Sequence, residues 1–277
     1  MAKNLAYLHQ KKRDRVKIAM LTCYDYPTAV LQDQAGLDVI FVGDSLGTNV
    51  LGYPREIFVT LEDIQHHLRA VRRGVEQAYL LVDMPYQTYE TPESALRTAR
   101  ALLDYGADGV KLEGMHPEVV TNLAEHGIEV WAHLGYNPQF HDQVAVQGKT
   151  FDRARQIVED AEQLEAVGAQ MLVLELVPEE LGQVITDALR IPTIGIGAGR
   201  YTDGQVLIVH DMLGITPRTI HHARDYGHLR AMMTQAFEEF IASVEGNTFP
   251  EVANVRHLSR QERNRLLQWR RDRDFHK

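Results

Sequence analysis

Residues that can do chemistry follow short apolar segments throughout this chain of 277 residues. At these positions stand Tyr24, Asp25, Asp44, Ser45, Asp83, Lys111, Glu113, His133, Glu175, the glycines of 197–199, His210 and Asp211. Carboxylates and histidines can bind divalent cations or transfer protons, depending on their surroundings. Such chemistry requires that residues far apart in the sequence meet at one place in the fold.

Strand geometry directs several of these side chains to the same side. Because successive side chains alternate across a strand, Lys111 and Glu113 share one face of their segment. The same alternation directs Asp83 and Glu175 there, and Asp44 ends its own segment. Four carboxylates and one lysine near one axis would repel unless something positive joined them. Oxygen ligands without a His/Cys cluster favour Mg²⁺ over zinc.

Each charged residue also has a purely structural interpretation. Asp83 could cap the helix that follows it, Lys111 and Glu113 could form a structural ion pair, and Glu175 could cap a helix or form a salt bridge. His133 shares its strand face with a tryptophan, so it could be a core histidine or a substrate contact. The combination favours a functional site, because a barrel that required only stability would place apolar side chains at these strand ends.

Two other clusters indicate structure more than chemistry. His66 and His67 lie in a predicted helix, where packing explains them better than metal binding. The glycines at 195, 197 and 199 predict a tight strand end near the site and not a phosphate-binding loop.

Eight apolar segments of strand length alternate with helical ones. They are rich in β-branched and aliphatic residues, as buried parallel strands are. They cover residues 17–25, 37–45, 78–85, 107–114, 129–135, 170–178, 191–199 and 206–212. Apolar residues with helical spacing occupy residues 60–73, 91–105, 151–167 and 178–189. The alternation predicts an α/β fold, a single (β/α)₈ TIM barrel with its chemistry at the carboxyl ends of the strands. An open doubly wound sheet is the alternative, but neither GxGxxG nor a Walker A sequence marks its ligand site.

Composition agrees with a single enzyme domain. The length is near the ~250 residues typical of such barrels, and 44% hydrophobic residues can fill a large core. A net charge of −9 argues against a nucleic-acid partner. The one cysteine, Cys23, excludes an internal disulfide and a multi-cysteine zinc site, and we expect it to be buried. We find no signal-like or membrane-length apolar run, and expect a cytoplasmic protein without a membrane partner.

The C-terminal part lies outside the strand and helix alternation. We expect a barrel catalytic domain over residues 1–250 and a helical C-terminal extension over residues 251–277. Ser259 and Glu262 have the spacing of a capping box. The apolar residues that follow are Leu266, Leu267 and Trp269. This pattern predicts a helix that docks on another subunit.

Motifs at many separate places resemble the ketopantoate hydroxymethyltransferase family. The resemblance runs from about residue 17 to about residue 250. The motifs are MLTCYDYPTA, DVIFVGDSLG, VTLEDIQHHLRAVRRG, LLVDMPYQTYETPESAL, GADGVKLEG, HLG, GAQMLVLELVP, IPTIGIGAG and TDGQVLIVHDMLGIT. The resemblance implies that the chain transfers a hydroxymethyl group from 5,10-methylenetetrahydrofolate to 3-methyl-2-oxobutanoate. The product is 2-dehydropantoate, in pantothenate biosynthesis, and the intermediate is a magnesium-stabilised enolate.

The resemblance also implies a role for each charged residue. The implied Mg²⁺ ligands are Asp44, Asp83 and Glu113. The implied oxo-acid contacts are Asp44, Ser45, Asp83 and Lys111. Glu175 is the implied proton acceptor, and His133 the implied contact to substrate or intermediate.

The chain departs from the family pattern in two segments. The family commonly reads HLGLTPQ where this chain has HLGYNPQ, which introduces Tyr136 and Asn137. Residues 53–58, YPREIF, also differ from the expected pattern. Both departures concern the oxo-acid preference and the folate contacts more than the reaction.

Two other functions fit the same fold. A lyase or mutase of the isocitrate lyase and phosphoenolpyruvate mutase type also has a magnesium-bound oxo acid. Such enzymes often use a cysteine on a flexible loop, whereas Cys23 lies on the first predicted strand. A non-enzymatic barrel kept for assembly or regulation predicts the loss of cluster residues, and none is lost. Ketopantoate hydroxymethyltransferases form large homo-oligomers, commonly decamers, so the resemblance implies a homo-oligomer.

Overall fold

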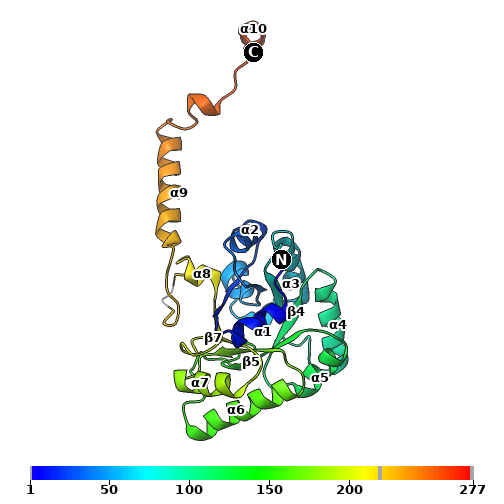
Figure 1. Cartoon of the computed structure of the whole chain (residues 1–277). Helices are drawn as coiled ribbons and strands as arrows, with labels where there is room; N and C mark the ends of the chain where they lie inside the picture. The colour runs from blue at the N-terminus through cyan, green and yellow to red at the C-terminus, as the bar shows by residue number, and fades with distance from the viewer. Residues whose placement is uncertain (1, 218–219, 275–277) are drawn as a thin grey trace. The chain divides into compact units, whose positions relative to one another are not determined.

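Parallel strands form a closed barrel at the centre of the fold (Figure 1). The computed structural model describes residues 2–217 and 220–274, and within them eight strands pair in sequence order, with β8 returning to β1. The strands are β1 (Ile18–Thr22), β2 (Val39–Val42), β3 (Tyr79–Asp83), β4 (Gly109–Glu113), β5 (Val130–Gly135), β6 (Met171–Glu175), β7 (Thr193–Ile196) and β8 (Gly204–Leu207). The predicted (β/α)₈ barrel is confirmed.

Side chains of the strands alternate between the barrel interior and the surrounding helices. Leu81 and Val173 belong to a buried cluster inside the barrel. Leu80 belongs to a second, larger cluster that includes residues of the outer helices. Because side chains two residues apart share a face, Asp83 and Glu175 continue the inward rows of Leu81 and Val173. The predicted face of these two carboxylates therefore agrees with the packing.

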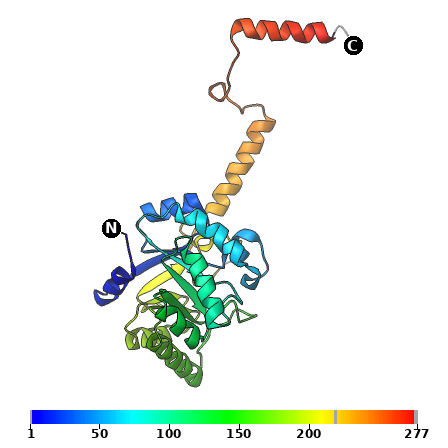
Figure 2. The ribbon, with the colours of Figure 1, turned by 90° about the vertical axis from the view of Figure 1, so that its right-hand side faces the viewer.

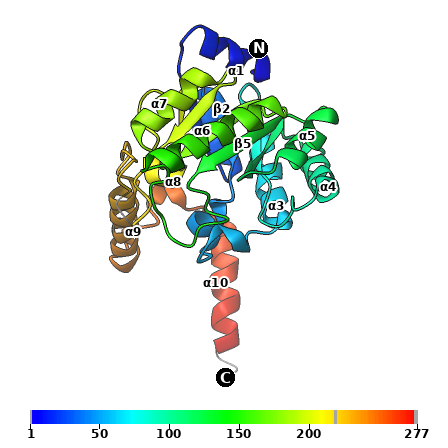
Figure 3. The same ribbon diagram turned by 90° about the horizontal axis from the view of Figure 1, so that it is seen from below.

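Helices lie on the outside of the strands, as the views in Figures 2 and 3 show. The α-helices of the barrel unit are α1 (Leu5–Arg13), α2 (Tyr26–Gln34), α3 (Leu61–Arg72), α4 (Pro92–Leu103), α5 (Pro117–Glu125), α6 (Phe151–Ala166), α7 (Glu179–Ala188) and α8 (Val209–Met212). The four predicted helices are confirmed as α3, α4, α6 and α7. Capping boxes at Thr60 and Thr91 start α3 and α4. Each threonine hydroxyl accepts a hydrogen bond from a backbone N–H of the first turn, and each threonine backbone N–H donates one to the side chain three residues later.

Helix α1 was not predicted, because only one of its side chains, Leu8, is buried. Leu8 belongs to the cluster inside the barrel. Lys11 lies 2.5 Å from Asp38, just before β2, and Lys12 lies 2.7 Å from Asp203, just before β8. Helix α1 therefore covers the amino-terminal end of the barrel and leaves the carboxyl end for the chemistry.

Two predicted strand ends have a different structure. Strand β8 ends at Leu207, and His210 and Asp211 lie in the short helix α8. Asp25 caps α2, since its carboxylate accepts a hydrogen bond of 2.9 Å from the backbone N–H of Thr28. The glycines of 197–199 follow the end of β7, where a tight strand end was predicted.

The chain divides into two compact units, Met1–Gly227 and His228–Lys277. The second unit contains α9 (Leu229–Glu245), a short 3₁₀ turn (Val252–Asn254) and α10 (Arg260–Asp274). The sequence placed the boundary at residues 250/251, where the resemblance stops. The division by internal contacts falls after Gly227, and α9 buries none of its described side chains. Residues 275–277 of the predicted extension lie outside the described residues. Within the described chain, we find no helix whose length and apolar character would let it cross a bilayer.

Candidate active site

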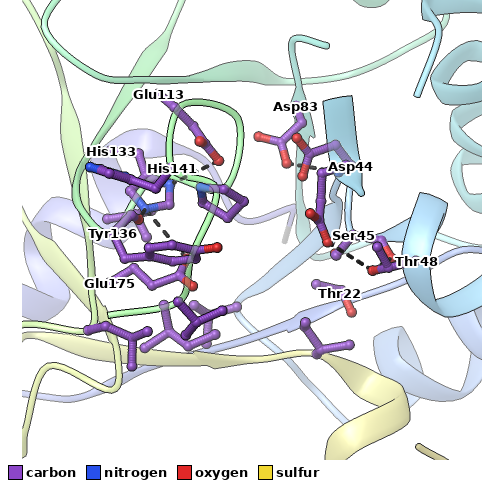
Figure 4. Close-up of a pocket in the computed structure, with 18 of the residues that line it drawn as sticks. Thr22, Asp44, Ser45, Thr48, Asp83, Glu113, His133, Tyr136, His141 and Glu175 are labelled. Carbon is purple, nitrogen blue, oxygen red and sulfur yellow. Dashed lines mark hydrogen bonds and ion pairs between the residues drawn. The ribbon is translucent and has the colours of Figure 1, made fainter. Parts of the chain in front are cut away.

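The charged residues named from the sequence line one cavity at the carboxyl ends of the strands. The cavity has a volume of about 330 Å³, and its walls include Asp44, Ser45, Asp83, Lys111, Glu113, His133 and Glu175. Figure 4 shows Asp44 and Asp83 on one side, and Glu113, His133 and Glu175 on the other. The fold therefore brings together residues from β3, β4, β5, β6 and the turn after β2.

Lys111 is the cation of this cluster. Its Nζ lies 2.6 Å from Oδ1 of Asp83 and 3.7 Å from Oε1 of Glu113, and all three side chains are buried. Burial alone lowers the pKa of Lys111, but Asp83 and Glu113 outweigh it and raise the pKa above its ordinary value. The lysine therefore stays protonated at neutral pH.

The carboxylates are less well compensated than the lysine. Burial raises the pKa of Asp83 to about 7 and the pKa of Glu113 well above its ordinary value, while Lys111 opposes and Asp44 reinforces both shifts. One lysine faces several carboxylates. Its charged form is therefore stabilised by all of them, whereas the carboxylates share a single positive charge. Oδ1 of Asp83 faces only the ammonium group of Lys111, at 2.6 Å. If all were ionised, the carboxylates would outnumber the one lysine, so the raised pKa values favour their protonated forms unless a further cation joins them.

The excess of carboxylates over lysine and the donor types fit a hard divalent cation. The available ligands are carboxylate oxygens, which Mg²⁺ prefers. As placed, no three His, Cys, Asp or Glu residues of the described chain form a ready-made metal site. Each carboxylate has another partner: Asp83 accepts the backbone N–H of Asp44 at 2.9 Å, and Gln139 donates to Asp44 and Glu113. The type of donor atom and the number of carboxylates fit a divalent cation better than the present distances between the carboxylates do.

His133 lies between two carboxylates. Its Nε2 is 2.9 Å from the carbonyl oxygen of Tyr136 and 3.5 Å from Oε2 of Glu175, and its Nδ1 is 3.6 Å from Oε1 of Glu113. Burial and then Lys111 lower the pKa of His133 well below its ordinary value, so the ring is neutral. Because a carbonyl oxygen only accepts, Nε2 carries the proton and Nδ1 is left as an acceptor. The position agrees with both interpretations of His133, a packed histidine and a substrate contact.

Glu175 is partly exposed to the cavity, with 17% of its side chain accessible. Burial raises the pKa of its carboxyl to about 8, Lys111 opposes the shift, and Asp44 adds to it. The backbone of Glu175 also packs closely against Gly135, which has a φ of 97° and where a side chain would collide with the Glu175 carbonyl oxygen. Glu175 therefore has the position and the proton affinity of a general base.

The two segments that depart from the family pattern lie at the mouth of the cavity. Arg55 and Glu56 line it from residues 53–58, and Tyr136 lines it from the loop after β5. Nη1 of Arg55 forms a 2.7 Å ion pair with Asp142, which joins the two loops. Departures in sequence thus cluster at the mouth and leave the carboxylates unchanged.

Several residues at or behind the cavity were not predicted. Two buried ones are Gln139, which donates to the carboxylates of Asp44 and Glu113, and Tyr89, whose hydroxyl contacts Gln139 and the backbone N–H of Glu113. Neither gives a signal in the sequence, because neither is ionised and both lie in loops. Cys23 is buried as predicted, and burial raises the pKa of its thiol to about 12. His67 packs on its helix and contacts the carbonyl oxygen of Tyr24 at 2.6 Å, which agrees with the structural interpretation.

Two solved structures have the same fold. Phosphonopyruvate hydrolase in complex with oxalate and Mg²⁺ has a TM-score of 0.62 and 12% identity, over 99% of this chain and 98% of that chain. A 2,3-dimethylmalate lyase, a PEP mutase/isocitrate lyase superfamily member, has a TM-score of 0.59 and 14% identity, over 95% of this chain and 94% of that chain. At this level of identity the similarity shows the fold alone.

Similarity in sequence identifies the family, which similarity in fold does not. A family model described as Ketopantoate hydroxymethyltransferase matches residues 2–252. The 3-methyl-2-oxobutanoate hydroxymethyltransferase of Dehalococcoides mccartyi is 45% identical over 258 residues, which are 90% of this chain and 92% of that protein. That of Chloroflexus aurantiacus is 45% identical over 248 residues, 87% of this chain and 88% of that protein. The chain therefore belongs to the ketopantoate hydroxymethyltransferase family, whose reaction is that of 3-methyl-2-oxobutanoate hydroxymethyltransferase in pantothenate biosynthesis.

Proposed function

We propose that this cavity carries out the family's reaction with Glu175 as the general base. The reaction is hydroxymethyl transfer from 5,10-methylenetetrahydrofolate to 3-methyl-2-oxobutanoate. The position of Glu175 supports the proposal most directly, since it ends β6 and faces Asp44 and Asp83 across the cavity (Figure 4). A carboxylate with a pKa of about 8 accepts a proton readily near neutral pH. Glu175 would take the proton from the third carbon of the oxo acid, and that carbon would then bond to the one-carbon unit of the donor.

Asp44, Asp83 and Glu113 are the residues that would hold Mg²⁺. When bound, the cation would supply Lewis-acid stabilisation of negative charge on the keto oxygen of the substrate. The excess of carboxylates over cationic side chains supports this assignment, because a buried cluster of like charges is costly without a counter-ion.

Lys111 and Ser45 would bind and orient the anionic substrate. Lys111 is buried and protonated at the cavity wall, so it can balance the negative charge that develops during proton removal. The Oγ of Ser45 lies 2.8 Å from the hydroxyl of Tyr24, which fixes the serine beside Asp44. His133, with its proton on Nε2, would position Glu175 and contact the substrate.

Proton exchange separates this function from the lyase and mutase alternative. We expect 3-methyl-2-oxobutanoate, incubated with the protein and Mg²⁺ in deuterated water, to lose its C3 proton signal in NMR without any folate. Adding 5,10-methylenetetrahydrofolate should give 2-dehydropantoate. Cleavage of a carbon–carbon or carbon–phosphorus bond in another 2-oxo acid, without exchange at C3, would instead favour the alternative. Fold similarity alone does not discriminate, because both classes share the barrel.

We propose further that the C-terminal helix α10 supports assembly of several copies of this chain. Its exposed apolar side chains are Leu266, Leu267 and Trp269. The backbone N–H of Glu262 lies 3.3 Å from Oγ of Ser259, which agrees with the predicted start of the helix. An exposed apolar stripe on a charged helix is typical of a protein contact.

Truncation after Asn254 should therefore change the size or stability of the oligomer more than turnover. Analytical ultracentrifugation measures the first, and kcat per active site measures the second. The substitution Arg263→Ala, on the same helix, serves as the control and should leave both unchanged. A fully assembled truncated protein without turnover would contradict the proposal and assign the tail to catalysis.

A further inference from the structure

Gln139 lies directly behind the carboxylates of the cavity. Its side chain is 3% exposed and comes from the loop that follows β5. Its Nε2 donates to Oδ2 of Asp44 at 2.8 Å and to the carbonyl oxygen of Met84 at 3.2 Å. Its backbone N–H donates to Oε2 of Glu113 at 3.0 Å. One residue thus contacts carboxylates on both sides of the cavity.

These contacts fix the orientation of two carboxylates that have few other donors. Hydrogen bonds to an ionised carboxylate are stronger than those between neutral groups, so they hold a buried side chain in one rotamer. Each bond uses a single oxygen, Oδ2 of Asp44 or Oε2 of Glu113. Gln139 leaves Oδ1 of Asp44 unused. Oε1 of Glu113 faces Lys111 Nζ at 3.7 Å and His133 Nδ1 at 3.6 Å, distances longer than a hydrogen bond, so it can still accept a closer partner. Gln139 also adds no charge to a cluster whose acidic side chains already outnumber its one lysine.

Tyr89 fixes the amide of Gln139 in turn. The tyrosine is 2% exposed, and its hydroxyl donates to Oε1 of Gln139. The same hydroxyl accepts a long hydrogen bond of 3.4 Å from the backbone N–H of Glu113. Because Oε1 accepts from Tyr89, the amide has one orientation, with its NH₂ group toward Asp44. A chain of contacts therefore runs from Tyr89 through Gln139 to Asp44.

We propose that Gln139 is a positioning residue that holds Asp44 and Glu113 in the arrangement from which they bind the divalent cation. This inference rests on the cation site of the proposed function. Residues that orient metal ligands typically contribute about 10–100-fold to metal affinity, although they do not touch the metal. Gln139 differs from a mere anchor of its loop because its bonds end on two of the three proposed ligands.

The substitution Gln139→Met tests the side-chain part of the proposal. Methionine keeps the length of glutamine and removes the amide that donates to Asp44, while the backbone N–H that donates to Glu113 remains. We expect Mg²⁺ affinity, measured by isothermal titration calorimetry, to fall by roughly 10–100-fold. The Mg²⁺ concentration that raises the melting temperature should increase by the same factor. Tyr89→Phe, which leaves the bond to Asp44 in place, should weaken Mg²⁺ binding in the same direction but less.

Gln32→Met is the matched control. Gln32 is also a buried glutamine, but it donates to the carbonyl oxygen of Thr22 at 2.9 Å and contacts none of the cluster carboxylates. Its Mg²⁺ affinity should equal that of the parent.

Three outcomes would overturn the proposal. If Gln139→Met melts earlier but binds Mg²⁺ with parental affinity, Gln139 only anchors its loop. If Gln139→Met does not fold, Tyr89→Phe decides, and parental Mg²⁺ affinity in that variant contradicts the chain of contacts. A parent protein without saturable Mg²⁺ binding refutes the cation site itself, which is a distinct failure because it precedes any variant.

Discussion

Glu175→Gln should remove proton exchange and hydroxymethyl transfer together, while substrate binding survives. Glutamine keeps the size of glutamate but cannot take up a proton at neutral pH. A positioned general base contributes about 10²–10⁴-fold, so both rates should fall by that factor. Deuterium exchange at C3, followed by NMR, measures the first rate, and 2-dehydropantoate formation measures the second. Calorimetry should show parental binding of Mg²⁺ and 3-methyl-2-oxobutanoate.

The pH dependence gives an independent check on the same residue. The base works when ionised, and its pKa is raised to about 8 by burial. The exchange rate of the parent should therefore rise about tenfold per pH unit below the pKa and level off above about pH 8. A bound cation would favour the ionised form of Glu175 and move the rising part of the pH–rate profile to lower pH. The residual exchange rate of Glu175→Gln should lack this rise with pH.

Glu179→Gln is the matched control for this substitution. Glu179 is the first residue of α7, after the loop that follows Glu175. Its Oε1 forms an ion pair with Nη2 of Arg200 at 2.8 Å. It should keep the parental rate and pH profile. Parental exchange in Glu175→Gln would assign the base to another residue, and His133 would be the next to test.

Asp83→Asn should separate cation binding from folding. Removal of a direct ligand should weaken Mg²⁺ affinity by more than the ~100-fold upper value for residues that only orient ligands. Binding of the oxo acid should weaken with it. Without Mg²⁺, the melting temperature should not fall, because Asp83 is a carboxylate whose pKa burial raises, and above that pKa its charge costs folding free energy. Asparagine removes this charge and leaves an oxygen for Lys111 Nζ, which lies 2.6 Å from Oδ1.

Asp33→Asn is the control, because it should affect stability and leave cation binding unchanged. Asp33 is a buried aspartate on α2 that accepts hydrogen bonds of 3.0 Å and 2.8 Å from the backbone N–H groups of Gln77 and Ala78. Its substitution should lower the melting temperature and leave Mg²⁺ affinity unchanged. Parental Mg²⁺ affinity in Asp83→Asn would remove Asp83 from the proposed cation site.

Local periodicity in the sequence determined the barrel and the position of its charges. The eight strands were predicted because buried strands carry continuous apolar runs. The side shared by Lys111 and Glu113 follows from the alternation of side chains along a single strand. Both features depend on residues within a few positions of one another, so no tertiary contact is needed to infer them. The family motifs then assigned the same residues to one reaction.

Tertiary structure decided which polar residues join the cavity and which support the fold. Asp25 looked like a site residue and is a helix cap, while Gln139 carries no charge and reaches two carboxylates. Gln139 and Asp44 are 95 residues apart in the chain and come together only when the barrel closes. The division after Gly227 likewise follows from the contacts within each unit, which join residues far apart in the sequence. Spacing along the chain predicts which way a strand side chain points. Contacts made by loops depend on the closed fold, because a loop has no fixed period that would direct its side chains.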